Sequence, residues 1–129
     1  SSSDAADQVN NLKNVDGQTV KLNSGATATV QGTMGRVYVH WNTGNWSVTT
    51  VANTQDVAQN TTQFANQVNS QLQKQDLTAK NVTNGEVTVY NQPQADEANS
   101  VKWQQSGQVA QVDGQHANTV IKIAADAKN

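Results

Sequence analysis

The chain has 129 residues, a length that suits one domain, and 33 of them are carboxamides, 16 Asn and 17 Gln. Charged residues make up only 14%, eight basic against ten acidic, which argues against a nucleic-acid-binding protein. No Cys is present, which excludes disulfides and thiolate metal sites, and no apolar run approaches the length of a membrane span.

Residues 1–15 are predicted to form a flexible tether, because the opening Ser-Ser-Ser-Asp-Ala-Ala-Asp is small and polar with nothing to bury. Val9, Leu12 and Val15 have approximate helical spacing, which leaves a short helix near residues 7–14 as an alternative. The apolar residues that follow fall in strand and helix periods. We therefore expect one folded domain over residues 16–129.

Four strands are predicted in the first half, over residues 19–22, 26–30, 36–41 and 46–51. The third is the clearest, because apolar and polar residues alternate along it. Its apolar face carries Val37, Val39 and Trp41, and its polar face carries Arg36, Tyr38 and His40. A short loop that contains Gly44 joins it to the fourth strand, as in a β-hairpin.

The apolar spacing then changes to three and four residues, which predicts an amphipathic helix over residues 56–72. Its apolar stripe contains Val57, Phe64, Ala65, Val68 and Leu72. The opposite face is polar, almost uncharged and therefore expected to be solvated. It carries Gln59, Asn60, Gln63, Asn66, Asn69 and Gln73.

The second half shows the same succession, with strands over residues 86–90, 100–103 and 108–112 and a short amphipathic helix from residue 117 to the C-terminus. The hairpin around Gly107 matches the one around Gly44, which raises the hypothesis of two βββα pseudo-repeats, about 17–75 and 76–129. We expect an α+β fold, an antiparallel sheet of about six strands with two helices packed on one face. The Val-bearing strand faces should meet the apolar stripes of both helices.

No motif of catalysis, of metal binding or of cofactor binding stands out. His40 and His116 are the only histidines, and neither lies in a metal-binding spacing. Asp96 and Glu97 are adjacent acids beside a Pro-containing loop, and paired acids can hydrolyse glycosides when a substrate separates them. Solvated surface is the favoured interpretation of this pair. Since the chain shows no other catalytic, cofactor-binding or metal-binding motif, we expect no enzyme activity, no cofactor and no metal.

Two groups of residues are candidates for ligand binding. Trp46 follows the hairpin turn and is the best candidate for an aromatic side chain at a rim, although the core is the favoured place for it, as for Trp41 and Trp103. The polar strand face of Arg36, Tyr38 and His40 combines the only Arg with an aromatic and a titratable ring. Such a face suits an acidic or glycan ligand, but a solvated sheet face has the same composition.

The opening segment resembles the stretch just after the lipidated Cys of a Gram-positive bacterial lipoprotein. The body, rich in Asn, Gln, Thr and Val, is similar to exported surface proteins of lactobacilli and related lactic acid bacteria. Residues 35–46, Gly-Arg-Val-Tyr-Val-His-Trp through Gly-Asn-Trp, resemble the strand pairs of small uncharacterised lipoproteins of that group. The resemblance implies a cell-surface protein, lipid-anchored to the cytoplasmic membrane, and carries over no functional residue.

Two function classes follow from these observations. The first is a non-catalytic extracytoplasmic domain that interacts with the cell wall or with another surface protein. The second is a small-ligand or glycan-binding module that uses Trp46 or the face of Arg36, Tyr38 and His40. A concave pocket lined by convergent polar groups would favour the second class. A cell-wall hydrolase that uses Asp96 and Glu97 is a distant third.

Overall fold

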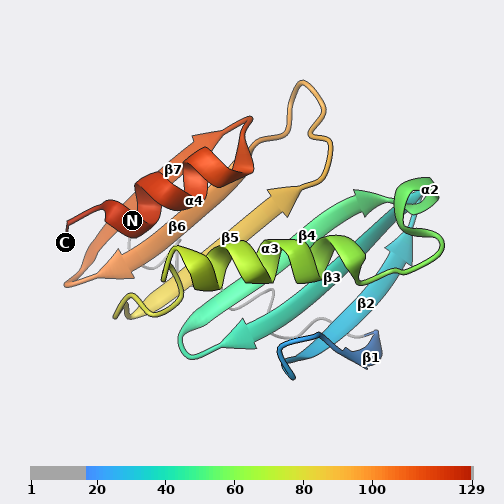
Figure 1. Cartoon of the computed structure of the whole chain (residues 1–129). Coiled ribbons are helices and arrows are strands. Elements are labelled where there is room, and N and C mark those ends of the chain that lie inside the picture. Colours follow the sequence, from blue (N-terminus) through green and yellow to red (C-terminus); the bar gives the residue numbers. More distant parts are fainter. Residues whose placement is uncertain (1–16, 129) are drawn as a thin grey trace.

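The computed structural model describes residues 17–128, and the predicted tether and its alternative short helix lie outside the described residues. The described chain forms one sheet of seven strands, which lie side by side in the order in which they occur in the sequence (Figure 1). The strands are β1 (Gln18–Lys21), β2 (Thr27–Thr33), β3 (Arg36–Thr43), β4 (Trp46–Asn53), β5 (Asn84–Tyr90), β6 (Asn99–Gln105) and β7 (Gln108–Gly114).

The sheet is mixed, and this corrects the expected antiparallel sheet of about six strands. Five of the six neighbouring pairs are antiparallel, but β4 and β5 run parallel. The segment between these two strands holds helices and carries the chain back to the end of the sheet at which β4 began. A crossover of this kind joins parallel strands, whereas a tight turn joins antiparallel ones.

The helical segment between β4 and β5 is split into α2 (Thr54–Val57) and α3 (Gln63–Lys74), where one helix over residues 56–72 was expected. Asn60 lies in the break. Its side-chain Oδ1 accepts hydrogen bonds from the backbone N–H and the hydroxyl of Thr62. A local Asx turn of this kind competes with helical hydrogen bonding, which accounts for the interruption.

α3 and α4 (Ala117–Asp126) lie along the same face of the sheet, as expected (Figure 1). The inward residues assigned from the sequence are confirmed, because both the strand valines and the helix stripes belong to one buried cluster. The stripe of α3 remains continuous across the break, since Val57 is also buried. Phe64 is only partly buried.

One side of α3 differs from the expected solvated face. Asn69 is only 8% exposed and donates from Nδ2 to the hydroxyl of Ser24, 2.9 Å away. One turn earlier, Asn66 accepts the backbone N–H of Asn23 through Oδ1 at 2.8 Å. These two carboxamides hydrogen-bond α3 to the turn between β1 and β2. They therefore make tertiary contacts, whereas the sequence predicted that they would face solvent.

The two halves of the chain share their element order. β2, β3 and β4 are followed by α3, and β5, β6 and β7 are followed by α4. The halves meet where β4 pairs with β5. There the Trp46 ring lies against Gly85, so closely that a Cβ built on Gly85 would be 2.3 Å from Cε3 of the ring. Glycine is needed at this position because the indole occupies the place of a side chain.

Candidate functional site

The structure does not bring the four predicted binding residues together. Arg36, Tyr38 and His40 alternate along β3 with core residues and so share the sheet face opposite the helices. Trp46 belongs to the core cluster on the helix side, is 1% exposed, and donates its indole N–H to the carbonyl of Lys80 at 3.1 Å. The alternative placement of Trp46 at the rim of a site is therefore wrong. Trp41 and Trp103 are buried as expected.

Arg36 is engaged in a bidentate ion pair. Its two terminal guanidinium nitrogens donate to the two carboxylate oxygens of Glu97, at 2.8 and 3.0 Å. The guanidinium carbon also lies 5.9 Å from the centre of the Tyr90 ring. The expectation that Glu97 is plain solvated surface is corrected, since its side chain is only 20% exposed. Asp96 is exposed, so the two adjacent acids differ in environment.

His40 lies on the expected strand face but is buried, with 5% of its surface exposed. Its Nδ1 is 3.0 Å from the Thr49 hydroxyl on the neighbouring strand, and its Nε2 has no hydrogen-bond partner among the described residues. Burial lowers the pKa of His40, which favours the neutral imidazole. This histidine is a packed residue of the sheet, not a free surface ligand.

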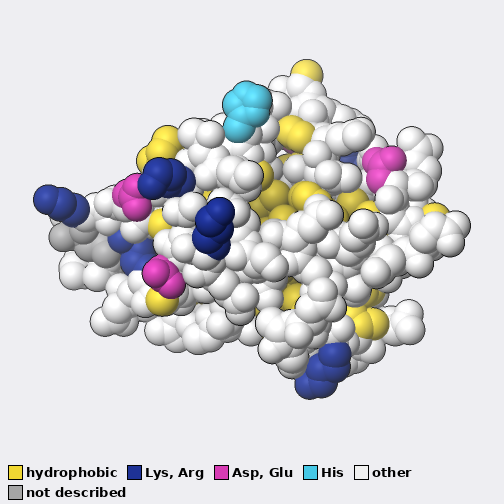
Figure 2. Space-filling model, in the orientation of Figure 1, with side chains coloured by type: hydrophobic (Ala, Val, Ile, Leu, Met, Phe, Trp, Pro, Cys, Tyr) yellow, Lys and Arg dark blue, Asp and Glu magenta, His cyan; other side chains and the backbone are white. Residues whose placement is uncertain are grey.

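A hollow with a volume of about 450 Å³ lies between α3 and α4. Its floor consists of the buried side chains of Val68, Val89 and Ile121. Phe64 lines it as a half-buried aromatic ring. Figure 2 shows hydrophobic side chains in the middle of this face. We call this hollow the α3–α4 cleft.

Four carboxamides border the α3–α4 cleft without a hydrogen-bond partner for their side chains among the described residues. They are Gln67, Gln71, Asn91 and Asn118. Three of the four are exposed and the fourth is half-buried, so they can turn toward a ligand without breaking an internal contact. A carboxamide offers both a donor group and an acceptor oxygen.

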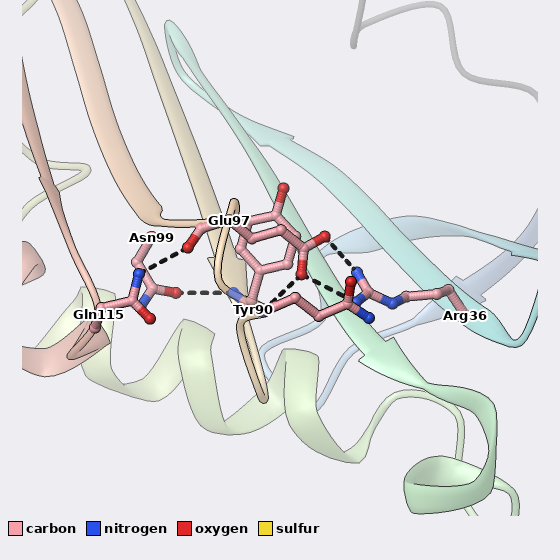
Figure 3. A network of polar contacts seen from close by, with 6 residues as sticks. Arg36, Tyr90, Glu97, Asn99 and Gln115 are labelled. Carbon is pink, nitrogen blue, oxygen red and sulfur yellow. Dashed lines mark hydrogen bonds and ion pairs between the residues drawn. The ribbon is translucent and has the colours of Figure 1, made fainter.

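The upper end of the cleft is fixed by a polar network (Figure 3). Buried Asn99 accepts the Tyr90 backbone N–H through Oδ1 at 2.8 Å and donates to the Gly114 carbonyl at 3.2 Å. Gln115 donates from Nε2 to the Glu97 carbonyl at 2.7 Å. The loop between β5 and β6 is thus tied to the start of α4 on one side and to β3 on the other.

The lining of the cleft includes no Asp, Glu, Lys or Arg. Burial raises the pKa of Tyr90, which lines the cleft, and so favours its neutral phenol. The nearest carboxylate of the network, Glu97, is held by Arg36 and by the Gln94 backbone N–H, and both lower its pKa. Within residues 17–128, no three His, Asp or Glu side chains gather closely enough to hold a metal ion. The arrangement is suited to hydrogen bonding with an uncharged ligand.

Sequence reasoning did not find the cleft. Gln67 and Gln71 are spaced four residues apart beside Phe64 and Val68, so one flank of the apolar stripe is amide-rich. That pattern was available in the sequence. The cleft itself depends on the distance between α3 and α4, which no local pattern encodes.

Comparison of the chain with protein-family models, with curated protein sequences and with solved structures gives no match.

Proposed function

We propose that this chain is a non-catalytic binding domain whose α3–α4 cleft holds an uncharged, hydroxyl-rich ligand, a glycan. The observation that carries the proposal is the cleft of about 450 Å³ with four unpaired carboxamides above an apolar floor and without an ionised carboxylate, ammonium or guanidinium group. Ligand pockets of this volume, mostly apolar with a few placed polar groups, are typical binding sites.

The chemistry of the lining favours a sugar. Each hydroxyl of a sugar is both donor and acceptor, and so is each carboxamide at the border of the cleft. The half-buried ring of Phe64 can lie against the apolar face of a sugar ring. The cleft replaces the outer strand face as the proposed site, because Arg36 is already paired and His40 is buried.

A hydrolytic role for Asp96 and Glu97 has less support. The Glu97 carboxylate is occupied by Arg36 and by the Gln94 backbone N–H, at 2.8 to 3.0 Å. Two catalytic carboxyl groups must face the same scissile bond from about 5–10 Å apart. A carboxylate locked in a bidentate ion pair is not free to serve as the general acid of such a pair.

We also propose an extracytoplasmic location with a lipid anchor, on the resemblance of residues 1–7 to the start of mature lipoproteins. Among the described residues, no helix has the length and apolarity that a bilayer crossing requires. The test is the sequence that the gene encodes upstream of Ser1. We expect it to encode a signal peptide and a Cys directly before Ser1, and any other upstream sequence would overturn the anchor.

The binding proposal is tested by isothermal titration calorimetry. The protein is titrated with the neutral hexasaccharides of N-acetylglucosamine and of glucose. At least one should bind, and Gln71→Ala should weaken that binding about 5-fold, since a net hydrogen bond contributes about 1 kcal/mol. Gln73→Ala is the matched control, because Gln73 is an exposed glutamine on the same helix outside the cleft. Failure of both sugars to bind, or equal effects of the two variants, would contradict the proposal.

A further inference from the structure

The α3–α4 cleft is the middle of a longer groove. A hollow of about 240 Å³ beside α2 shares Phe64, Gln67 and Asn91 with it. At the other end, a hollow of about 610 Å³ shares Gln71 and Asn118 with it. Hollows that share lining residues lie next to each other, so the three hollows form a row along α3. The groove therefore follows α3 from its first turn to beyond its last.

The dimensions of this groove exceed a single sugar unit. From Phe64 to Gln75, α3 rises about 16 Å, at about 1.5 Å per residue. The two helices run in the same direction along it, because the first turns of both line the cleft and their last turns line the far hollow. A ligand that lies along the whole groove must be a chain.

The far end of the groove differs in chemistry from its middle. Ile123 on α4 is 52% exposed and lines the hollow there, beside the ion pair between Lys122 and Asp126. An exposed isoleucine offers apolar contact to a second sugar ring. Lys122 and Asp126 neutralise each other at 3.0 Å, so this end suits an uncharged ligand. Asp56 is the one charged residue that lines the hollow at the α2 end.

From the shared walls of these three hollows we infer that the ligand is a linear neutral oligosaccharide of several units, laid along the groove between α3 and α4. The inference rests on the proposed glycan-binding function and extends it to the size of the ligand. An extended peptide is less suited, because β5 on the floor is already paired with β4 and β6. A peptide strand therefore finds no free sheet edge in the groove to which it could add.

The test is a length series of N-acetylglucosamine and glucose oligomers with one to six units, measured by calorimetry on the full chain. We expect the affinity of the bound sugar to rise at least 10-fold from the dimer to the hexamer. A hexamer affinity within 2-fold of the dimer affinity would overturn the linear ligand and leave the glycan proposal standing. Absence of binding at every length would overturn both.

A variant at the far end gives a second measurement. Ile123→Ser should weaken binding of the hexamer at least 3-fold and leave binding of the dimer unchanged. The side chain is half exposed, so the variant should keep the wild-type melting temperature within a few degrees. Equal weakening of dimer and hexamer, or of neither, would contradict the extended groove. Val109→Ser, at another exposed apolar residue outside the groove, is the control.

Discussion

At the scale of single residues, the sharpest packing constraint is the contact between the Trp46 ring and Gly85. We expect Gly85→Ala to destabilise the protein by about 3 kcal/mol, because the new methyl group would lie 2.3 Å from the ring and both sides are buried. Gly32→Ala is the control, since the nearest atom to its new Cβ is 3.9 Å away. Urea denaturation measures both, and equal stability of the two variants would contradict this explanation.

Also at the residue scale, the role of a carboxamide depends on its neighbours rather than on its type. Asn66, Asn69 and Asn99 form internal hydrogen bonds, whereas Gln67 and Gln71 are free to face the cleft. The sequence placed Asn66 and Asn69 on one solvated helix face, because polarity and helical spacing alone do not show which amides meet another element. What separates them is the position of the β1–β2 turn and of α4, which are distant in the chain.

At the scale of elements, the loop between β5 and β6 is held by the ion pair of Arg36 with Glu97. The folded state lowers the pKa of Glu97, so the stabilisation is present above the unfolded carboxyl pKa of about 4.3 and is lost as the pH falls through the lower folded value. We expect Glu97→Gln to melt below the wild type at pH 7, and the difference to shrink as the pH falls below about 4.3 and through the lower folded pKa of Glu97.

Melting curves at several pH values check the prediction for Glu97. Asp96→Asn is the matched control, because it removes the same charge from the adjacent, exposed side chain. A difference between wild type and Glu97→Gln that stays constant from pH 7 to pH 3 would show that the charge of the pair does not contribute.

The elements themselves were largely predictable from the sequence. Period-two runs located every strand to within a few residues, and the alternation along β3 correctly separated Val37 from Arg36. The parallel pairing of β4 with β5 was missed, since strand periodicity contains no information on direction. The break at Asn60 was missed because the apolar stripe continues across it and a side-chain turn leaves the period unchanged.

At the scale of the whole molecule, the question is whether the two halves are separate units. They share six residue pairs between β4 and β5. Two side chains of the first half also bond the segment before β5, Asn45 to the Val82 carbonyl at 3.0 Å and Trp46 to the Lys80 carbonyl at 3.1 Å. The contact between the halves is thus part of the core. Each half alone would expose buried residues on the side where β4 pairs with β5.

We therefore expect the chain to unfold in one two-state transition, although its element order repeats. The calorimetric enthalpy should be about 80 kcal/mol at a melting temperature near 60 °C and should equal the van't Hoff enthalpy. Two resolved transitions, or a calorimetric enthalpy about twice the van't Hoff value, would show two independent units. Gly85→Ala gives a second test, because Gly85 lies where the two halves pair. If the halves unfold together, this variant should lower the melting temperature of the single transition. If they unfold independently, one transition should keep its wild-type melting temperature.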